Sequence, residues 1–459
     1  MNQKKIIYTA VISLILLLFL GFITVGQNQN KFAQSVKSLI PEVVKTALKK
    51  TIFAVPVLIE ENIINRHKID TLFIKNSLLE SRIQRLENPQ YLEKLKPRKI
   101  TSKNNKEYNL ELYKLPFPDH DGWALKPVAY LDKYNDKIFI LSGRADIFYV
   151  DQFDKSFKYT EIASNIKSLI KDKKFYDPFI LSIKDVLISG NKIYLTFGNI
   201  KDTCVSISVL VADINFEKLT FKNYFKKTEC HDYFKENDMN YQHIGGRIVE
   251  FKNNKLLLSV GDFGYEAMAQ DKNSIFGKIV SIDTKNNFNI FSMGSRNPQG
   301  LKYDKDADVI IHTEHGPTGG DEVNINIDLN NKKNFGWPVA SYGVTSAGDK
   351  FQTHKENNFD EPIKYFVPSI GISEILNIGK NFDEEFSNDY FVTALGWKTQ
   401  LEDGDNTIHH IRLNKEYTKI IYEDKIVIGE RIRDSIYLDN EKTILMSLET
   451  IPAIGFLKK

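Results

Sequence analysis

The chain has 459 residues, a formal net charge of +3, and 42% apolar and 12% aromatic residues. This composition is that of a globular protein with a sizeable core, and it excludes a disordered chain. The near balance of charge gives no sign of a nucleic-acid-binding surface.

The first 27 residues predict a membrane anchor. Lys4 and Lys5 precede Ile6–Val25, an uncharged run of 20 residues. A helix of this length spans a bilayer. The lysines favour a cytoplasmic N-terminus, so we expect the rest of the chain on the periplasmic, extracytoplasmic side. The alternative is a cleaved signal peptide. The long run has no clear small-x-small cleavage site, which favours the anchor.

Residues 28–109 are expected to form a helical, membrane-proximal segment. Leu72, Leu79, Ile83 and Leu86 have the spacing of one helix face. A self-associating coiled coil, and with it a homo-oligomer, is the alternative, but the heptad run is short.

Cys204 and Cys230 are the two cysteines of the chain. In an exported protein an isolated pair of this kind favours a disulfide. Two buried free thiols are the alternative.

Residues 110–459 have a sequence pattern typical of β-strands. One pattern recurs six times: a polar turn, a short apolar run rich in strand-forming residues, and then a small or polar residue. It reads NDKIFILSG from Asn135, GNKIYLTFG from Gly190, NNKLLLSVG from Asn253, DADVIIHTEHG from Asp306, SNDYFVTALG from Ser387 and DNEKTILMSL from Asp439. Such a repeat predicts an all-β, six-bladed β-propeller. A pair of β-sandwiches is the alternative.

Three of these runs lead directly into unusual loops. The loops hold Gly261–Asp262, Glu314–Pro317 and Leu395–Lys398. If each run is the same strand of its blade, all three loops lie at one face of the ring. We therefore expect them to converge on one axial mouth, where propellers commonly bind ligands.

His243 is a candidate general base, because its ordinary pKa lies near neutrality. In the stretch QHIGGRI two glycines, Gly245 and Gly246, come two and three residues after it and let the backbone approach another group closely. Asp262, between glycines at a strand end, is a candidate to orient the imidazole. A structural histidine and an ordinary turn are the alternatives.

Two arginine-bearing stretches are candidates for binding an anion. Arg296 and Asn297 precede Pro298 in GSRNPQG, and an arginine there can stabilise negative charge. Arg431 and Arg433 stand two apart, which places both on one face of a strand. Paired guanidinium groups suit a ligand with several carboxylates. Loops and strand faces in contact with solvent are the alternatives.

The turn Gly316–Pro317 is a candidate metal site. Its backbone carbonyls lie between Glu314, Asp321 and Glu322 in the sequence, and hard cations such as Ca²⁺ accept carbonyl and carboxylate oxygens. The alternative is an acidic surface turn. If the turn binds a metal, we expect the carboxylates to support the shape of the loop and the local charge.

In their order along the chain, these motifs resemble the glucose/sorbosone dehydrogenase family. The similarity is dense from Tyr241 to Gly343 and resumes at Arg431–Asp434. The resemblance implies a six-bladed propeller. The family's enzymes use pyrroloquinoline quinone (PQQ) and Ca²⁺ to oxidise the anomeric carbon of an aldose to a lactone.

The resemblance also implies a role for each matching residue. His243 corresponds to the general base and Asp262 to the carboxylate that assists it. Contacts to the quinone fall on Arg296, Asn297, His315, Arg431 and Arg433, and the Ca²⁺-binding carbonyls fall on Gly316 and Pro317. Lys398, in the stretch ALGWKTQ, is the candidate for a further cofactor-binding lysine, displaced by about two residues from the family's position.

The sequence therefore predicts a membrane-anchored quinoprotein sugar dehydrogenase with a small sugar substrate and an unidentified electron acceptor. The first alternative is a non-catalytic propeller that binds a ligand or a partner. The second is a metal-dependent lactonase, which predicts side-chain carboxylates as the main metal ligands.

Overall fold

The computed structural model describes residues 91–116, 129–151, 156–170, 183–201, 204–226, 229–232, 243–378, 382, 388–396 and 406–459. These residues belong to one compact unit, Ser81–Lys459. The expected anchor, residues 1–27, lies outside the described residues, as does most of the expected helical segment. Among the described helices, none has the length and apolar character needed to cross a membrane.

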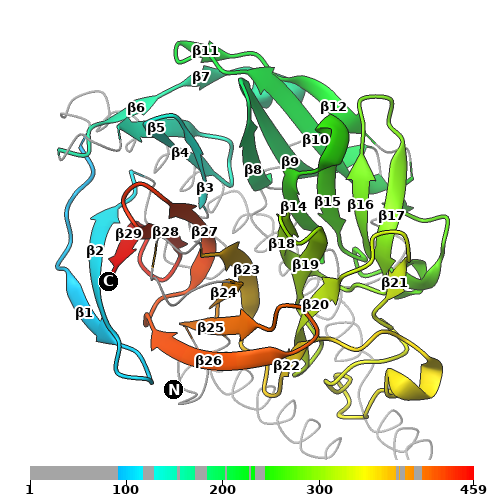
Figure 1. Ribbon diagram of the computed structural model, residues 1–459. Helices are drawn as coiled ribbons and strands as arrows, with labels where there is room; N and C mark the ends of the chain where they lie inside the picture. The colour runs from blue at the N-terminus through cyan, green and yellow to red at the C-terminus, as the bar shows by residue number, and fades with distance from the viewer. Residues whose placement is uncertain are drawn as a thin grey trace, which may run out of the picture. The chain divides into compact units, whose positions relative to one another are not determined.

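The described chain folds as a six-bladed β-propeller, as predicted, with the blades arranged around a central axis (Figure 1). Blade 1 holds β3 (Ala129–Tyr134), β4 (Lys137–Ser142), β5 (Ile147–Asp151) and β6 (Tyr159–Glu161). Blade 2 holds β8 (Ile183–Ser189), β9 (Lys192–Lys201), β10 (Cys204–Asp213) and β12 (Lys222–Lys226), with β13 (His231–Asp232) also paired to β10. Blade 3 holds β14 (Gly245–Glu250), β15 (Leu256–Val260), β16 (Lys278–Ile282), β17 (Phe288–Met293) and β21 (Lys333–Asn334).

Blade 4 holds β18 (Pro298–Asp304), β19 (Val309–Glu314), β20 (Asp321–Asn326) and β22 (Lys364–Phe366). Blade 5 holds β23 (Ile372–Asn377), β24 (Asp389–Ala394), β25 (Thr407–Leu413) and β26 (Ile420–Val427). Blade 6 holds β27 (Ile432–Leu438), β28 (Thr443–Leu448), β29 (Ala453–Lys458), β2 (Glu107–Lys114) and β1 (Arg98–Thr101). Outside the blades, β7 (Ala163–Ser164) pairs with β11 (Lys218–Leu219), and short helices form at α4 (Ile166–Leu169), η3 (Lys252–Asn254), η4 (Glu266–Gln270) and η5 (Lys355–Asn357).

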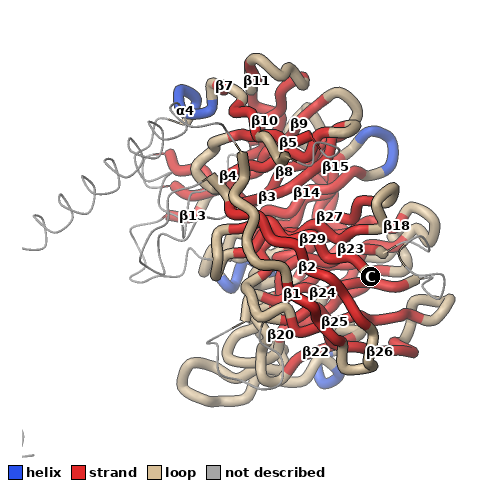
Figure 2. The backbone as a smooth tube through the Cα atoms, turned by 90° about the vertical axis from the view of Figure 1, so that its left-hand side faces the viewer, coloured by secondary structure: helices blue, strands red, loops and turns tan. Residues whose placement is uncertain are grey.

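Blade 6 closes the ring, because it combines strands from both ends of the described chain. β2 pairs antiparallel with the last strand, β29, and places Leu110 opposite Leu457. Figure 2 shows β1, β2 and β29 side by side near the C-terminus. The sheet thus begins at Arg98, earlier than the boundary at residue 110 that the sequence suggested. Within residues 91–109 the chain contains β1, the start of β2 and the turn between them, and no helix, because these strands supply the outer edge that blade 6 would otherwise lack.

The six repeated sequence runs form the second strand of each blade: β4, β9, β15, β19, β24 and β28. In β15, β24 and β28 every residue is buried. A second strand has a neighbouring strand on each side and a neighbouring blade against each face, so both of its faces need apolar side chains. This position explains why the runs are almost continuously apolar, and why they were visible in the sequence.

Apolar clusters fill the spaces between blades. One cluster joins blades 1, 2 and 3, and others lie between blades 3 and 4, 4 and 5, 5 and 6, and 6 and 1. Burial of this surface is the main force that holds the ring together.

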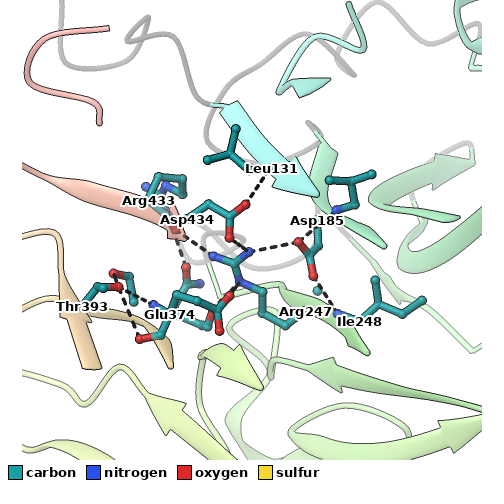
Figure 3. A network of polar contacts seen from close by, with 12 residues as sticks. Leu131, Asp185, Arg247, Ile248, Glu374, Thr393, Arg433 and Asp434 are labelled. Atoms are coloured by element: carbon teal, nitrogen blue, oxygen red, sulfur yellow. Dashed lines mark hydrogen bonds and ion pairs between the residues drawn. The ribbon is translucent and has the colours of Figure 1, made fainter. Parts of the chain in front are cut away.

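The innermost strands carry a repeated irregularity. A β-bulge interrupts β8, β14, β18, β23 and β27 close to the N-terminal end of each strand. A bulge re-aims a side chain locally. Figure 3 shows the result, a network in which Asp185, Glu374 and Asp434 from three blades converge on Arg247.

Cys230 is disulfide-bonded, and Cys204 is the other cysteine of the chain. The backbone of Cys204 pairs with that of Asp232 at the edge of blade 2. The bond agrees with the disulfide that the sequence favoured over free thiols.

Candidate active site

The candidate residues gather at the end of the ring where second strands finish and innermost strands begin. His243 lies just before β14, and Asp262 just after β15. Arg296 precedes β18, and Arg431 precedes β27, while the Gly316 turn follows β19. The expected convergence of the loops on one face follows from this alternation of strand direction.

His243 and Asp262 form a hydrogen-bonded pair. The distance from His243 Nδ1 to Asp262 Oδ1 is 3.0 Å, and the His243 side chain is 12% exposed. The same carboxylate oxygen accepts the backbone N–H of Gly264 at 2.7 Å. As the carboxylate is an acceptor here, Nδ1 carries the proton and Nε2 keeps its lone pair.

The surroundings of His243 favour its neutral imidazole form. Burial lowers its pKa below the ordinary 6.5, and the positive charge of Arg296 lowers it further. The hydrogen bond and the charge of Asp262 act in the opposite direction. A neutral, oriented imidazole whose Nε2 lone pair is available has the properties of a general base.

Backbone contacts fix this pair in place. Phe263 N donates to His243 O at 3.0 Å, and Asp262 N donates to Arg296 O at 2.8 Å. A Cβ on Gly261 would lie 1.9 Å from the His243 carbonyl oxygen. Only glycine lets the end of β15 pass so close to the chain that carries His243.

Trp337 completes the site and was missed in the sequence reasoning. Its indole Nε1 donates to Asp262 Oδ2 at 2.8 Å, so both oxygens of Asp262 are engaged. The guanidinium of Arg296 lies 5.5 Å from the centroid of the Trp337 ring, a cation–π contact. The run FGWP was visible in the sequence, but nothing in it points to a partner 75 residues away.

Arg296 connects the histidine pair to the Gly-Pro turn. Its Nη1 donates to Gly316 O at 2.9 Å and to His315 O at 3.3 Å. The backbone N–H of Arg296 donates to Glu314 Oε1 at 2.9 Å. The side chain of Glu314 therefore shapes the loop, as expected for a supporting carboxylate, and its burial raises its pKa well above 4.5.

Asn297 is buried and its side chain is engaged within the protein. Its Oδ1 accepts from Gly245 N at 3.2 Å and from Gln299 Nε2 at 2.8 Å. Its backbone carbonyl accepts the N–H of His315 at 3.1 Å. The amide group of Asn297 thus links the start of β14 to the start of β18.

The Gly316–Pro317 turn is stabilised by a buried carboxylate. Asp321 Oδ1 accepts the N–H of Gly316 at 3.1 Å, and Asp321 Oδ2 accepts the N–H groups of Ile370 and Ile372 at 3.0 and 2.9 Å. Asp321 is thereby committed to backbone donors. The metal ligands expected at this turn are backbone carbonyls, and the described residues contain no cluster of three or more His, Cys, Asp or Glu side chains arranged to hold a metal.

His315 is a neutral side chain at the mouth. Burial lowers its pKa to about 4, against a smaller opposing effect from Asp321, and the nearby charges of Arg296 and Arg433 add to the lowering. A neutral imidazole near these two arginines can accept or donate a hydrogen bond without adding positive charge.

Arg431 and Arg433 share one buried carboxylate, Glu449, which the sequence reasoning did not single out. The distance from Arg431 Nε to Glu449 Oε2 is 3.2 Å, and that from Arg433 Nε to Glu449 Oε1 is 2.5 Å. Burial alone would raise the pKa of Glu449, but the two guanidinium groups bring it below 4.5. The pair keeps an excess of one positive charge.

The other hydrogen bonds of the two arginines go to residues of blades 5 and 4. Arg431 Nη1 donates to Leu395 O and Gly396 O, both at 2.8 Å. Arg433 Nη1 donates to Gln299 Oε1 at 3.2 Å. Lys398 lies outside the described residues, so its expected role stays a prediction.

Comparison with known proteins agrees with this picture. The family profile described as "Glucose / Sorbosone dehydrogenase" matches residues 186–448. The chain is 31% identical over 219 residues to the uncharacterised protein slr1608 of Synechocystis, covering 42% of this chain and 50% of that protein. It is 29% identical over 212 residues to the aldose sugar dehydrogenase YliI of Escherichia coli, covering 42% of this chain and 53% of that protein. The matched part thus spans about half the length of these curated relatives.

Solved structures show the same fold. The soluble aldose sugar dehydrogenase of Escherichia coli, in its apo form, superposes with a TM-score of 0.59 at 19% identity, over 76% of this chain and 99% of that one. The PQQ-bound aldose sugar dehydrogenase of Streptomyces coelicolor gives a TM-score of 0.51 at 16% identity, over 73% and 96%. The profile covers more than half of the chain, and the propeller and the motif order agree with it, so this protein belongs to the glucose/sorbosone dehydrogenase family.

Proposed function

We propose that this protein is a quinoprotein sugar dehydrogenase. It oxidises an aldose, or a related sugar or alcohol, at the anomeric carbon to a lactone, with PQQ and Ca²⁺ as cofactors. The observation that carries the proposal is the buried His243–Asp262 pair, 3.0 Å apart, next to the guanidinium of Arg296. Membership of the family and a relative named as an aldose sugar dehydrogenase support the reaction class.

The residues at the mouth fit an anionic quinone. Arg296, Arg431 and Arg433 present guanidinium groups, and Glu449 neutralises one charge of the Arg431–Arg433 pair. A ligand with several carboxylates suits this excess of positive charge. These three arginines, with Asn297 and His315, would hold the cofactor. The relative from Streptomyces coelicolor is described as PQQ-bound, which supports the choice of quinone.

The Gly316–Pro317 turn fits a hard cation. Carbonyl oxygens are the ligands that Ca²⁺ accepts, and each has two lone pairs. Arg296 uses one lone pair of Gly316 O, at 2.9 Å. The second lone pair and the carbonyl of Pro317 would hold the metal. When bound, the quinone and Ca²⁺ supply an electron-pair acceptor and a Lewis acid.

The remaining chemistry belongs to the chain. Nε2 of His243 would take the proton of the C1 hydroxyl group of the sugar. Asp262 holds Nδ1 and stabilises the imidazolium that forms. Arg296, fixed between the Trp337 ring and the Gly316 carbonyl, would stabilise negative charge that develops near it.

The membrane anchor and the extracytoplasmic location are part of the same proposal. The N-terminal sequence supports them, and the disulfide at Cys230 is typical of an oxidising compartment.

A direct experiment tests the activity. The purified protein, loaded with PQQ and Ca²⁺, is assayed with a panel of aldoses and a dye acceptor. We expect turnover with at least one sugar, and its loss in His243→Gln, with the quinone still bound. Binding of PQQ without turnover on any sugar or alcohol would contradict the proposed reaction.

A second candidate function is a non-catalytic binding module. The observation that favours it is that Arg431 and Arg433 already have partners in Glu449, Leu395 O and Gln299. Titration with PQQ separates the two functions, because a binding module for another ligand leaves the absorption spectrum of the quinone unchanged.

A further inference from the structure

One buried arginine on the propeller axis contacts every blade. Arg247, from β14 of blade 3, is 4% exposed. Its guanidinium lies 5.4 Å from the ring centroid of Tyr130 in blade 1. It reaches Asp185 in blade 2 at 3.0 Å, Gln299 O in blade 4 at 2.6 Å, Glu374 in blade 5 at 2.9 Å, and Asp434 in blade 6 at 2.6 Å. Figure 3 shows the three carboxylates around the guanidinium.

Arg247 also binds the backbone of two residues of the candidate active site. Its Nη2 donates to the backbone oxygen of Arg433 at 2.7 Å, and its Nε donates to the backbone oxygen of Gln299. The side chains of these two residues meet at the mouth, where Arg433 Nη1 donates to Gln299 Oε1 at 3.2 Å. Arg247 therefore binds the backbone of Gln299 and of Arg433, the two residues whose side chains form this pair.

The carboxylates of the network are anchored as well. Asp434 Oδ2 accepts the N–H of Leu131 at 2.6 Å, and Asp185 Oδ2 accepts the N–H of Ile248 at 2.8 Å. Glu374 Oε1 accepts the N–H of Ile375 at 2.8 Å. Asp434, Asp185 and Glu374 are thus bonded to the innermost strands of blades 1, 3 and 5, respectively. The guanidinium group of Arg247 binds all three carboxyl groups.

The charge of the network argues for a positional role. Three buried carboxyl groups face one arginine, and a buried ion cluster of this kind contributes little net stability compared with an apolar core. An apolar side chain at position 247 could fill the space that the arginine side chain occupies at the centre of the ring. It could not bind the carbonyls of Gln299 and Arg433, which are the groups next to the mouth.

We propose that Arg247 is a positioning residue for the Gln299–Arg433 pair, and that it sets the geometry with which the mouth receives an anionic cofactor. The first part concerns the protein alone. The second rests on the proposed function, in which Arg433 contacts the carboxylates of the quinone.

Hydrogen exchange on the unliganded protein tests the first part. In Arg247→Lys the single ammonium group can replace only part of the guanidinium contacts, so we expect amides in residues 299–301 and 431–435 to exchange at least about tenfold faster. The matched control is Arg412→Lys, whose guanidinium holds the buried carboxylate of Asp389 in blade 5, away from the axis. In this control we expect no change in the two mouth segments.

Two outcomes would overturn the positional role. One is wild-type exchange in both mouth segments of Arg247→Lys. The other is an equal acceleration in all blades, including β5 and β26, because that would show a loss of global stability alone.

Titration with PQQ in the presence of Ca²⁺ tests the link to the cofactor. We expect the Kd of Arg247→Lys to rise about tenfold or more and that of Arg412→Lys to stay within about twofold of wild type. Failure of the wild type to bind PQQ would count against the proposed function, and the exchange data would still decide the positional role. An unchanged Kd in Arg247→Lys, with binding by the wild type, would contradict the link to the cofactor.

Discussion

Trp337 donates its indole N–H to the oxygen of Asp262 that His243 does not use. The two hydrogen bonds are 2.8 Å from Nε1 to Oδ2 and 3.0 Å from Nδ1 to Oδ1. Asp262 is therefore fixed from both sides and cannot rotate away from the imidazole. The ring of Trp337 also supports Arg296, so one side chain positions the candidate base and the candidate electrostatic group together.

The substitution Trp337→Phe tests this relationship. Phenylalanine keeps an aromatic face for Arg296 but has no N–H for Asp262. The carboxylate loses a donor and becomes a stronger acceptor for the imidazole, so we expect the pKa of His243 to rise. Proton NMR titration of the histidines measures it. We expect kcat to fall about tenfold, since a less firmly held base is less well oriented.

The control for this variant is Phe351→Leu. The Phe351 ring lies 5.5 Å from that of Trp337 and contacts neither Asp262 nor Arg296 in any hydrogen bond or ring contact found among the described residues. We expect the pKa of His243 to stay unchanged there. The same shift in both variants would show that packing, and not the indole N–H, controls the imidazole.

A second substitution, Asp262→Asn, removes the charge that stabilises the imidazolium form. Burial and Arg296 then lower the pKa of His243 without opposition, so it falls further below 6.5 than in the wild type. We expect kcat/KM to fall on the order of 10²–10⁴-fold, because the base is weaker and its orientation is lost. The pH profile checks both effects. We expect the acidic limb of the wild-type profile to lie below pH 6.5, and that of the variant to lie at a lower pH than in the wild type.

The parts of the fold that could be predicted are those whose pattern lies within a few neighbouring residues of the sequence. The second strands, such as β15 and β24, are buried on both faces and read as continuous apolar runs. The mouth loops that follow them contain glycine, proline and charged residues within a few positions. These two features were enough to predict the ring and the face on which the candidate site lies.

The parts that the sequence did not reveal depend on distant partners. β2 alternates buried and partly exposed residues like an ordinary edge strand, and nothing in it indicates pairing with Ala453–Lys458. Glu449 follows an apolar run and has no local sign of its two arginine partners. Arg247 lies in the stretch QHIGGRI together with His243, but the residues that it contacts belong to the five other blades, so no local pattern in the sequence indicates its partners.

Glu449→Gln is expected to destabilise the protein. Glu449 is 4% exposed, and its carboxylate is the shared partner of Arg431 and Arg433. The amide leaves two guanidinium groups without a counter-charge in a largely buried position, which costs about 3–5 kcal/mol in the free energy of unfolding. Urea denaturation at fixed pH measures this loss.

The matched control for Glu449 is Glu111→Gln. Glu111 pairs with Lys94 and Lys458 at 3.3 and 3.2 Å on the surface of blade 6. Exposed pairs contribute little to stability because water screens both charges, so we expect almost no change in the urea midpoint. Similar losses in the two variants would show that the Glu449 site is hydrated and its charge screened.

The stability of the protein is expected to fall as the pH rises from 6.5 to 8. Burial raises the pKa of Glu322 to about 8 and that of Asp132 to about 7. In this range the folded protein retains protons that the unfolded chain has already released, so unfolding becomes more favourable as the pH increases. The buried histidines act at lower pH. Burial lowers the pKa of His312 and of His409 to about 3, so they destabilise the fold only below their ordinary value of 6.5.

Urea unfolding at pH 6.5, 7.25 and 8 checks this prediction, with Glu322→Gln as the informative variant. The amide keeps a partner in Asn324, whose Nδ2 lies 3.2 Å from Glu322 Oε2, but cannot ionise. We therefore expect a smaller decline in the free energy of unfolding for this variant than for the wild type. Glu356→Gln, an exposed side chain on η5, serves as the control and should keep the wild-type slope, because its carboxylate is ionised throughout this range in both states. A free energy of unfolding that is constant or increases from pH 6.5 to 8 would mean that the buried carboxyl groups are ionised in the folded protein and have partners stronger than the contacts described above.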